Sequence, residues 1–242
     1  MSLDTLDKDE IIQFSKLAED WWNEEGKMSF LHAMSETRTR YIKEAIIQNF
    51  KIPKKKHILA GIEILDIGCG GGIASEPLSR MGGKLTSIDE SKELINIAKL
   101  HAKAMRLDIK YEHSNIDNLL KSKKQYDVII ALELLEHVNN VEYFCEVLSK
   151  LIKSNGLIII STINRSILSK MIVIKFAEDI LKKIPSGTHS YKKFIKPIEI
   201  KKYFNSINLN MYDLKGMVWG PIRGWRLSNN TSINYIATLK KK

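Results

Sequence analysis

Residues 62–73 read Ile-Glu-Ile-Leu-Asp-Ile-Gly-Cys-Gly-Gly-Gly-Ile, and the fold depends on this stretch. An apolar run that ends in glycines and is followed by the helix-forming residues 74–80 is typical of a buried strand, a tight turn and a helix start. Gly68 permits the turn, Gly70 lets a ligand approach the backbone, and the helix start offers unpaired N–H groups. The stretch therefore predicts a site for a nucleotide-like ligand.

Two carboxylates indicate which nucleotide this is. A dinucleotide fingerprint needs a third glycine where Ile73 stands, and Asp66 before the turn would repel a pyrophosphate but attract a sulfonium or amino group. Asp89 ends the next predicted strand, residues 84–89, where a carboxylate accepts hydrogen bonds from ribose hydroxyls. The pair favours S-adenosylmethionine, and the stretch resembles the class I methyltransferases. A dinucleotide or mononucleotide site with an unusual loop is the alternative.

Composition and charge limit the class of protein. The chain has 242 residues, 44% of them hydrophobic, which predicts one sizeable core and a single domain over residues 1–242, with residues 1–57 as an N-terminal helical segment. Cys69 and Cys145 form no close-spaced pair, so we expect neither a zinc site nor a disulfide between them. No run of residues predicts a membrane span, a signal segment or a transit segment, which favours a bacterial cytoplasmic protein. The net charge of +10 predicts a polyanionic partner, either nucleic acid or an anionic lipid surface.

Strand and helix patterns alternate along the rest of the chain. This alternation predicts an α/β fold with a doubly wound, Rossmann-like sheet and helices on both faces. Ligands of such sheets bind beyond the carboxyl ends of the strands, where Gly68, Asp89, Ile116 and Leu132 fall. The predicted helices are 9–23, 36–50, 91–106, 141–152 and 198–204, residues 28–32 form a loop, and the predicted strands are 62–67, 84–89, 109–113, 126–132, 157–163, 209–214 and 233–239.

Two features of the N-terminal helices have a structural and a functional interpretation. Trp21 and Trp22 predict packing against the domain, with a substrate contact as the alternative. Arg38 and Arg40 lie near a helix start, where a positive charge gains nothing from the helix dipole. One of the two arginines would then be held for a ligand carboxylate, unless both are solvated.

The candidate chemistry follows the fourth predicted strand. If residues 133–137 are helical, Glu133, Glu136 and His137 share one face. Such a set could hold a divalent ion, with the carboxylates favouring Mg²⁺ and the histidine tolerating Zn²⁺. His137 as a general base without a metal is the competing interpretation.

Residues 164–197 are an insertion after the fifth strand. Its apolar segment, residues 167–184, has lysines in excess, which predicts a lid on the active site, a surface that lies on anionic lipid, or simple core packing. Few aromatic residues accompany the basic stretch 192–196, so we expect no nucleic acid partner there, although a nucleic-acid methyltransferase, or one with another small-molecule substrate, is the rival function.

Further motifs resemble one family closely. They are Asp66 to Gly72, Glu133 to His137, Ser-Thr-Ile-Asn-Arg at 161–165, Pro-Ser-Gly-Thr-His at 185–189 and Lys-Lys-Phe-Ile-Lys-Pro at 192–197. Together with Trp21, Trp22 and Arg38 they resemble the ubiquinone biosynthesis O-methyltransferases over most of the chain.

The resemblance implies a function and a set of site residues. It implies methyl transfer from S-adenosylmethionine to ring hydroxyls of polyprenylated phenols and quinols at two steps of ubiquinone biosynthesis. The cofactor residues would be Arg38, Gly68, Asp89 and Leu132. The ligands of Mg²⁺ or Zn²⁺ would be Glu133, Glu136 and His137. The base would be His137 or His189. A substrate that resides in the bilayer implies a cytoplasmic enzyme on the periphery of the inner membrane, with other enzymes of the pathway as partners.

Overall fold

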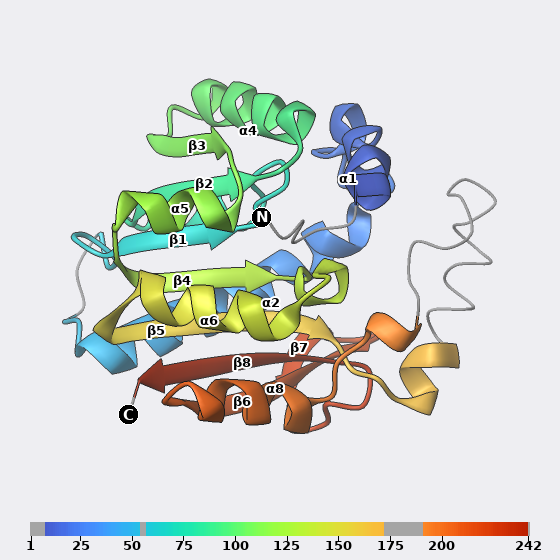
Figure 1. The fold of residues 1–242 in the computed structure, drawn as a ribbon. Coiled ribbons are helices and arrows are strands. Elements are labelled where there is room, and N and C mark those ends of the chain that lie inside the picture. Colours follow the sequence, from blue (N-terminus) through green and yellow to red (C-terminus); the bar gives the residue numbers. More distant parts are fainter. Residues whose placement is uncertain (1–7, 54–56, 172–190, 242) are drawn as a thin grey trace.

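An eight-stranded sheet forms the centre of the computed structural model, with strand order β3-β2-β1-β4-β5-β8-β6-β7 (Figure 1). The structure describes residues 8–53, 57–171 and 191–241. The five strands from β1 to β5 are parallel to one another. They are β1 (Glu63–Ile67), β2 (Lys84–Asp89), β3 (Ile109–His113), β4 (Tyr126–Leu132) and β5 (Ile152–Ile163).

The parallel strands are the part of the sheet that the sequence predicts best. β2, β3 and β4 have the predicted bounds. β4 is an apolar run covered on both faces, and β3, at the edge of the sheet, alternates apolar and polar residues. β5 begins at Ile152, five residues before the predicted start at 157, and its pairing with β4 shifts register between Tyr126 and Val128.

The other half of the sheet is antiparallel. β8 (Asn234–Lys241) lies between β5 and β6 (Leu209–Gly220), and β7 (Gly224–Ser228) pairs with β6 as a hairpin at the edge. The sequence predicts a shorter strand in place of β6 and no strand at β7. β7 has only five residues and begins with the glycine of the turn, so its alternation of side chains is too short to be recognised as a strand.

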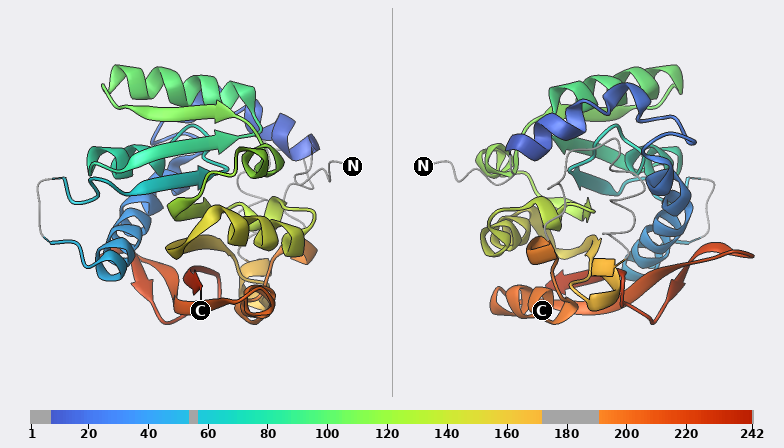
Figure 2. Two further views of the ribbon diagram at one scale, coloured as in Figure 1. Left: turned by 60° about the vertical axis from the view of Figure 1, so that its left-hand side comes forward. Right: turned by 90° about the vertical axis from the view of Figure 1, so that its right-hand side faces the viewer.

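Helices cover both faces of the sheet, as predicted (Figure 2). The core on one face includes residues of α5 (Ile116–Ser122), α6 (Val141–Leu151) and α8 (Pro197–Ser206), and the core on the other includes residues of α2 (Ser29–Phe50) and α3 (Ser75–Arg80). α4 (Lys92–Ala104) packs beside β3 and β2. Asparagine or serine side chains cap the N-termini of α4, α5 and α6, which fixes where these helices begin.

The N-terminal elements differ from the prediction. The expected helix 9–23 is wrong in its second half: α1 (Lys8–Ser15) ends where Ser15 Oγ bonds Ile11 O and Ser91 Oγ, and a short 3-10 turn (Ala18–Asp20) follows. The expected loop 28–32 is wrong as well. α2 begins at Ser29 without a side-chain cap, so the sequence has no start signal there.

The predicted insertion is described only in part. Residues 172–190 lie outside the described residues, and with them most of the apolar segment 167–184 and the candidate base His189. Residues 164–171 and 191–197 belong to the described chain, and Ile167 and Met171 are exposed there. Among the described helices none is long and apolar enough to cross a membrane.

Candidate functional site

The glycine turn after β1 holds a conformation that other residues rarely adopt. Gly68 and Gly70 have φ angles of 69° and 53°. The Gly70 N–H donates to Asp89 Oδ2 at 2.8 Å, and the Gly68 N–H donates to Ile88 O at 2.9 Å. These bonds join the loop after β1 to the end of β2, so Gly68, Gly70 and Asp89 lie together as predicted.

Asp89 links the glycine loop to the start of α4. Its Oδ1 accepts the Ser91 N–H at 2.8 Å, and Ser91 in turn caps α4 by accepting the Leu94 N–H. Burial raises the pKa of Asp89, while the N–H groups of Ser91 and Gly70 lower it. Each carboxylate oxygen can accept a second hydrogen bond, so Asp89 can still bind ribose hydroxyls.

A narrow cavity lies beside Asp89. Only about 20 Å³ of it is open, whereas pockets for small molecules span about 300–1,000 Å³, so a small molecule could enter only if lining side chains moved apart. Ile116, which the sequence places at the carboxyl edge of the sheet, lines this cavity. The lining residues are Ile67, Gly68, Ile88, Asp89, Glu90, Ser114, Asn115, Ile116, Leu134 and Phe144.

Asp66 is not among the residues that line this cavity. It is buried, and Ser75 Oγ donates to its Oδ2 at 2.5 Å while also contacting Ser87 Oγ at 2.8 Å. Burial, and to a lesser extent the charge of Asp89, raises the pKa of Asp66 to about 7. Asp66 therefore ties α3 to β1, and its predicted attraction for the cofactor stays a prediction.

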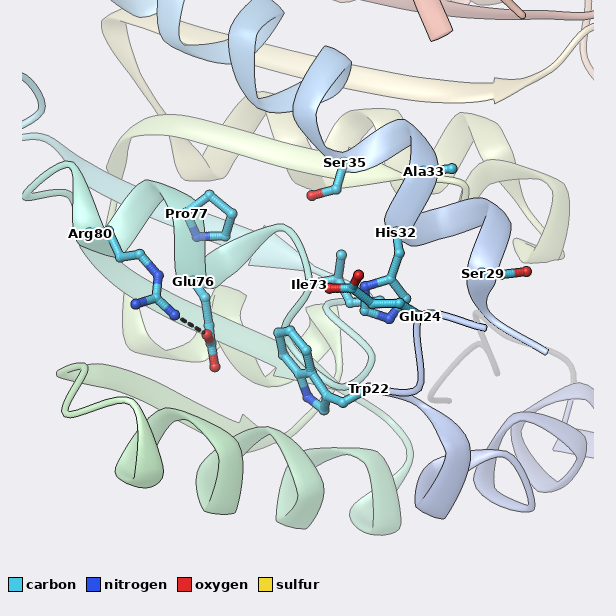
Figure 3. Close-up of a pocket in the computed structure, with 10 residues that line it drawn as sticks. All are labelled: Trp22, Glu24, Ser29, His32, Ala33, Ser35, Ile73, Glu76, Pro77 and Arg80. Atoms are coloured by element: carbon cyan, nitrogen blue, oxygen red, sulfur yellow. Dashed lines mark hydrogen bonds and ion pairs between the residues drawn. The ribbon is translucent and has the colours of Figure 1, made fainter. Parts of the chain in front are cut away.

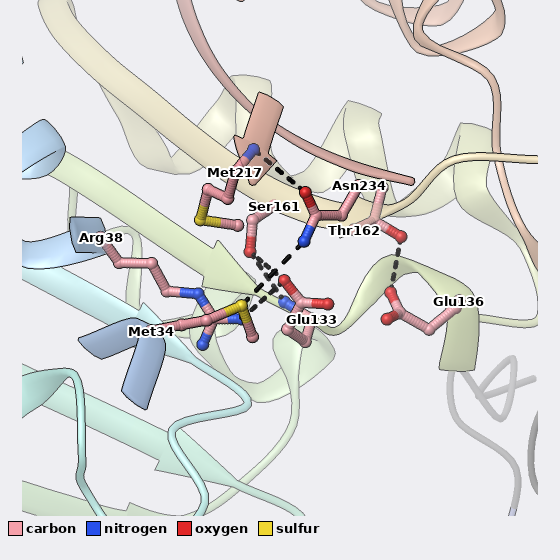
Figure 4. A network of polar contacts seen from close by, with 8 residues as sticks. All are labelled: Met34, Arg38, Glu133, Glu136, Ser161, Thr162, Met217 and Asn234. Atoms are coloured by element: carbon pink, nitrogen blue, oxygen red, sulfur yellow. Dashed lines mark hydrogen bonds and ion pairs between the residues drawn. The ribbon is translucent and has the colours of Figure 1, made fainter. Parts of the chain in front are cut away.

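Arg38 is the buried arginine of the N-terminal helices, whereas Arg40 is exposed. Figure 4 shows Arg38 beside Glu133 and Met34. Arg38 Nη2 donates to Glu133 Oε1 at 2.8 Å. Its Nε–H is buried and has no acceptor among the described residues. A buried donor without an acceptor is costly, so this atom suits a ligand carboxylate.

Glu133 follows β4 in a left-handed conformation, with φ at 49°. Its backbone N–H donates to Ser161 O at 2.9 Å, and Ser161 Oγ donates to Glu133 Oε1 at 2.8 Å. The side chain is therefore held toward Arg38 and Ser161. Leu132, the residue before it, is partly buried at the end of β4 and packs against the core that includes residues of α2 and α3.

Glu136 and His137 lie in a 3-10 turn, Leu135–His137, and both are buried. Thr162 Oγ1 donates to Glu136 Oε2 at 2.6 Å, and the His137 ring makes an edge contact with Phe14 at 5.3 Å between centroids. Burial, followed by the charge of Glu133, raises the pKa of Glu136 to about 7. A buried carboxyl at the carboxyl edge of the sheet thus holds a proton near neutral pH.

The expected shared helical face is wrong, because Glu133 is in the left-handed region and the turn after it is 3-10. Within the described part of the chain no three His, Cys, Asp or Glu side chains are grouped to hold a metal ion. As arranged here, Glu133, Glu136 and His137 do not fit a metal.

A second cavity lies between the N-terminal segment, α2 and α3 (Figure 3). It measures about 430 Å³ and shares no lining residue with the cavity beside Asp89. The buried carboxylate of Glu76 lies at its wall, where Arg80 donates to Oε2 at 2.9 Å and His101 Nδ1 lies 2.6 Å from Oε1. This cavity is larger, but the carboxyl ends of β2 and β3, where ligands of such sheets bind, are at the smaller one.

Leu134 is a site residue that the sequence analysis did not single out. A Cβ atom at Gly68 would lie 2.7 Å from Leu134 Cδ1, so Gly68 is required by this leucine as well as by its own φ angle. The sequence gives no sign of this contact, because Leu134 stands next to Glu133 in a charged motif and Gly68 is far away along the chain.

The comparison with known proteins agrees with this geometry. Residues 32–214 match a family model described as a methyltransferase domain. The ubiquinone biosynthesis O-methyltransferase of Pelagibacter ubique (strain HTCC1062) is 43% identical over 240 residues, which cover 99% of this chain and 100% of that protein. This chain belongs to the ubiquinone biosynthesis O-methyltransferase family. It is an S-adenosylmethionine-dependent O-methyltransferase.

Other relatives extend the comparison. The ubiquinone biosynthesis O-methyltransferase of Rhizobium leguminosarum bv. trifolii (strain WSM2304) is 36% identical, covering 98% of this methyltransferase and 95% of its own length. The magnesium protoporphyrin IX methyltransferase ChlM from Synechocystis PCC 6803, solved with bound SAH, has a TM-score of 0.61 at 15% identity and covers 95% of this chain and 100% of its own. The plantazolicin methyltransferase BpumL has a TM-score of 0.62 at 19% identity, and the match covers 97% of this chain and 98% of its own. These structures share the class I methyltransferase fold.

Proposed function

We propose that this methyltransferase moves the methyl group of S-adenosylmethionine to ring hydroxyls of polyprenylated catechol and demethylubiquinol intermediates, at two steps of ubiquinone biosynthesis. The observation that carries the proposal is the 43% identity, over nearly the whole of both chains, to a relative that bears this name. The arrangement of glycine loop and carboxylate at the sheet edge supports it, because these are the groups that such a cofactor needs.

The cofactor would lie along the carboxyl edge of the sheet. Asp89 accepts hydrogen bonds from the ribose hydroxyls, and Ile116 covers the adenine ring. The loop at Gly68 and Gly70 lets the methionine part of the cofactor approach the backbone. Arg38 has a buried Nε–H to offer to the carboxylate. Leu132, the last residue of β4, would also contact the cofactor.

The reaction needs a deprotonated ring hydroxyl in line with the methyl group. A phenol has a pKa of about 10, so little phenolate is present at neutral pH. The bound cofactor supplies a methyl group already activated by a positive sulfur. The protein therefore has to position the ring and accept one proton. His137, which follows β4, is the candidate base, and His189 is the alternative.

A metal requirement can be tested separately. Binding of Mg²⁺ or Zn²⁺ would require Glu133, Glu136 and His137 to come together, and Arg38 and Ser161 hold Glu133 by its Oε1 while Thr162 holds Glu136. Because the described arrangement holds these side chains apart, we expect methyl transfer to persist after dialysis against EDTA. Loss of transfer that Mg²⁺ or Zn²⁺ restores would show that the three side chains rearrange around an ion.

The substrate and the cofactor site are tested by one assay. Methyl transfer from S-adenosylmethionine to a short-tailed prenyl catechol is measured for the wild type, for Asp89→Asn and for Asp108→Asn, which makes the same chemical change at an exposed position. We expect transfer by the wild type and Asp108→Asn, with KM for S-adenosylmethionine raised in Asp89→Asn. Cofactor binding without transfer to the catechol would refute the proposed substrate.

We further propose that the enzyme lies on anionic membranes, on the cytoplasmic side of the inner membrane, where it would meet its substrate and other enzymes of the pathway. The support is the side chains of Ile167 and Met171, 77% and 56% exposed, beside Lys170, on a chain with a net charge of +10. Sedimentation with anionic liposomes should fall in Ile167→Glu/Met171→Glu. Ile222→Glu, which changes an equally apolar residue that is 94% exposed, is the control and should sediment like the wild type.

A further inference from the structure

The indole of Trp21 lies directly on the glycine loop. A Cβ atom at Gly71 would be 2.8 Å from Trp21 Nε1, and one at Gly70 would be 3.0 Å from Trp21 Cη2, so both glycines are needed for this close contact. The Trp21 side chain is only 6% exposed. Its Nε1–H is buried and has no acceptor among the described residues.

The neighbouring side chains hold Trp21 in this orientation. His32 Nε2 lies 2.8 Å from Trp21 O. Trp22 stacks on His101, with 3.5 Å between ring centroids and an angle of 8° between the planes, and its Nε1–H donates to Gly71 O at 3.0 Å. The two adjacent indoles therefore differ. The N–H of Trp22 donates a hydrogen bond to the backbone, and the N–H of Trp21 has no acceptor among the described residues.

The position of Trp21 along the sheet indicates which part of the cofactor it meets. Asp89 at the end of β2 takes the ribose, and the cavity at the end of β3 takes the base. The amino-acid part then lies beyond β1 and β4, the next strands in the sheet, where the loop at Gly70 and Gly71 is found. Arg38, bonded to Glu133 at the end of β4, has the other unpartnered N–H of this region.

Two buried donors without acceptors at this end of the site call for an anionic ligand group. We propose that the Nε1–H of Trp21 donates a hydrogen bond to the carboxylate of S-adenosylmethionine and acts with Arg38 to recognise the amino-acid end of the cofactor. The inference rests on the proposed use of that cofactor. It makes Trp21 a specificity-determining residue rather than only a packing residue, since a phenylalanine would fill most of the same space without the donor.

The test compares two ligands in two variants. S-adenosylhomocysteine carries the carboxylate, and S-adenosyl-3-thiopropylamine lacks it but keeps the nucleoside and the amine. Titration calorimetry measures both with the wild type, Trp21→Phe and the matched control Trp22→Phe. Because hydrogen bonds to charged groups are the stronger ones, Trp21→Phe should weaken binding of S-adenosylhomocysteine about tenfold or more and change binding of the decarboxylated analogue less than about twofold. Trp22→Phe should change both affinities by the same factor.

An equal loss for both ligands in Trp21→Phe would show that the indole only packs on the loop, and no loss for either would show that its N–H is not used; both results overturn the proposal. If Trp21→Phe fails to fold, benzothienylalanine at position 21 replaces the N–H by sulfur and keeps the ring size, with the same expected selectivity. A wild type that binds neither ligand would instead refute the proposed cofactor.

Discussion

Arg38→Met is expected to lower the free energy of unfolding by about 3 kcal/mol. The Arg38 and Glu133 side chains are 7% and 16% exposed and form an ion pair at 2.8 Å, so the substitution leaves a largely buried carboxylate without its cation. Removing one partner of a buried pair costs about 3–5 kcal/mol. Glu133 retains the hydrogen bond from Ser161 and some contact with water, which places the cost at the lower end.

The double variant Arg38→Met/Glu133→Gln identifies the cause. It removes the unpaired charge, and the amide oxygen of glutamine can still accept from Ser161, so about half of the lost stability should return. Urea unfolding followed by circular dichroism without cofactor measures all of these variants. Arg40→Met, which removes an exposed arginine of the same helix, is the control and should stay within about 0.5 kcal/mol of the wild type.

Two results would refute this reasoning. One is an Arg38→Met protein as stable as the wild type, and the other is a double variant no more stable than the single one. The affinity for S-adenosylhomocysteine should stay low in both Arg38 variants, because the unpartnered Nε–H is absent from each. Recovery of stability without recovery of affinity would therefore separate the two roles of this arginine.

Further predictions concern Asp66 and the glycine loop. Burial raises the pKa of Asp66 from 3.8 to about 7, so the folded protein keeps a proton that the unfolded chain releases, and stability falls as the pH rises from about 4 to about 7. Asp66→Asn should flatten that fall in urea unfolding at a series of pH values; an unchanged pH dependence would contradict the assignment. Gly72→Ala should destabilise more than Gly61→Ala, since both glycines have positive φ angles, 95° and 88°, but a Cβ at Gly72 would overlap the Tyr111 hydroxyl and one at Gly61 meets nothing within 4 Å. Thermal unfolding measures the difference, and Tyr111→Phe in the Gly72→Ala background should recover part of it.

The sequence predicts the parallel half of the sheet and the cofactor edge because their signals are local. A short run rich in apolar residues with a glycine or a charged residue at its end is visible within a few residues, which is why β1, β2 and β4 lie where expected. The start of α2 at Ser29 and the edge strand β7 were not predicted. The first has no capping side chain and the second is short, so packing against the rest of the protein determines both.

The candidate site shows a sharper limit of sequence reasoning, and Glu133 is the clearest example. Its residue type marks it as a candidate ligand, yet a left-handed φ angle of 49° turns its side chain away from the face that helical spacing assigns to it. Its partner Arg38 comes from 95 residues earlier in the chain, and no periodicity connects the two. The residue types at the edge of a sheet can therefore be read from the sequence, but their charge state and role depend on partners from distant segments. For this reason the carboxylate that the pattern made a candidate metal ligand is, in the folded protein, the counter-ion of Arg38.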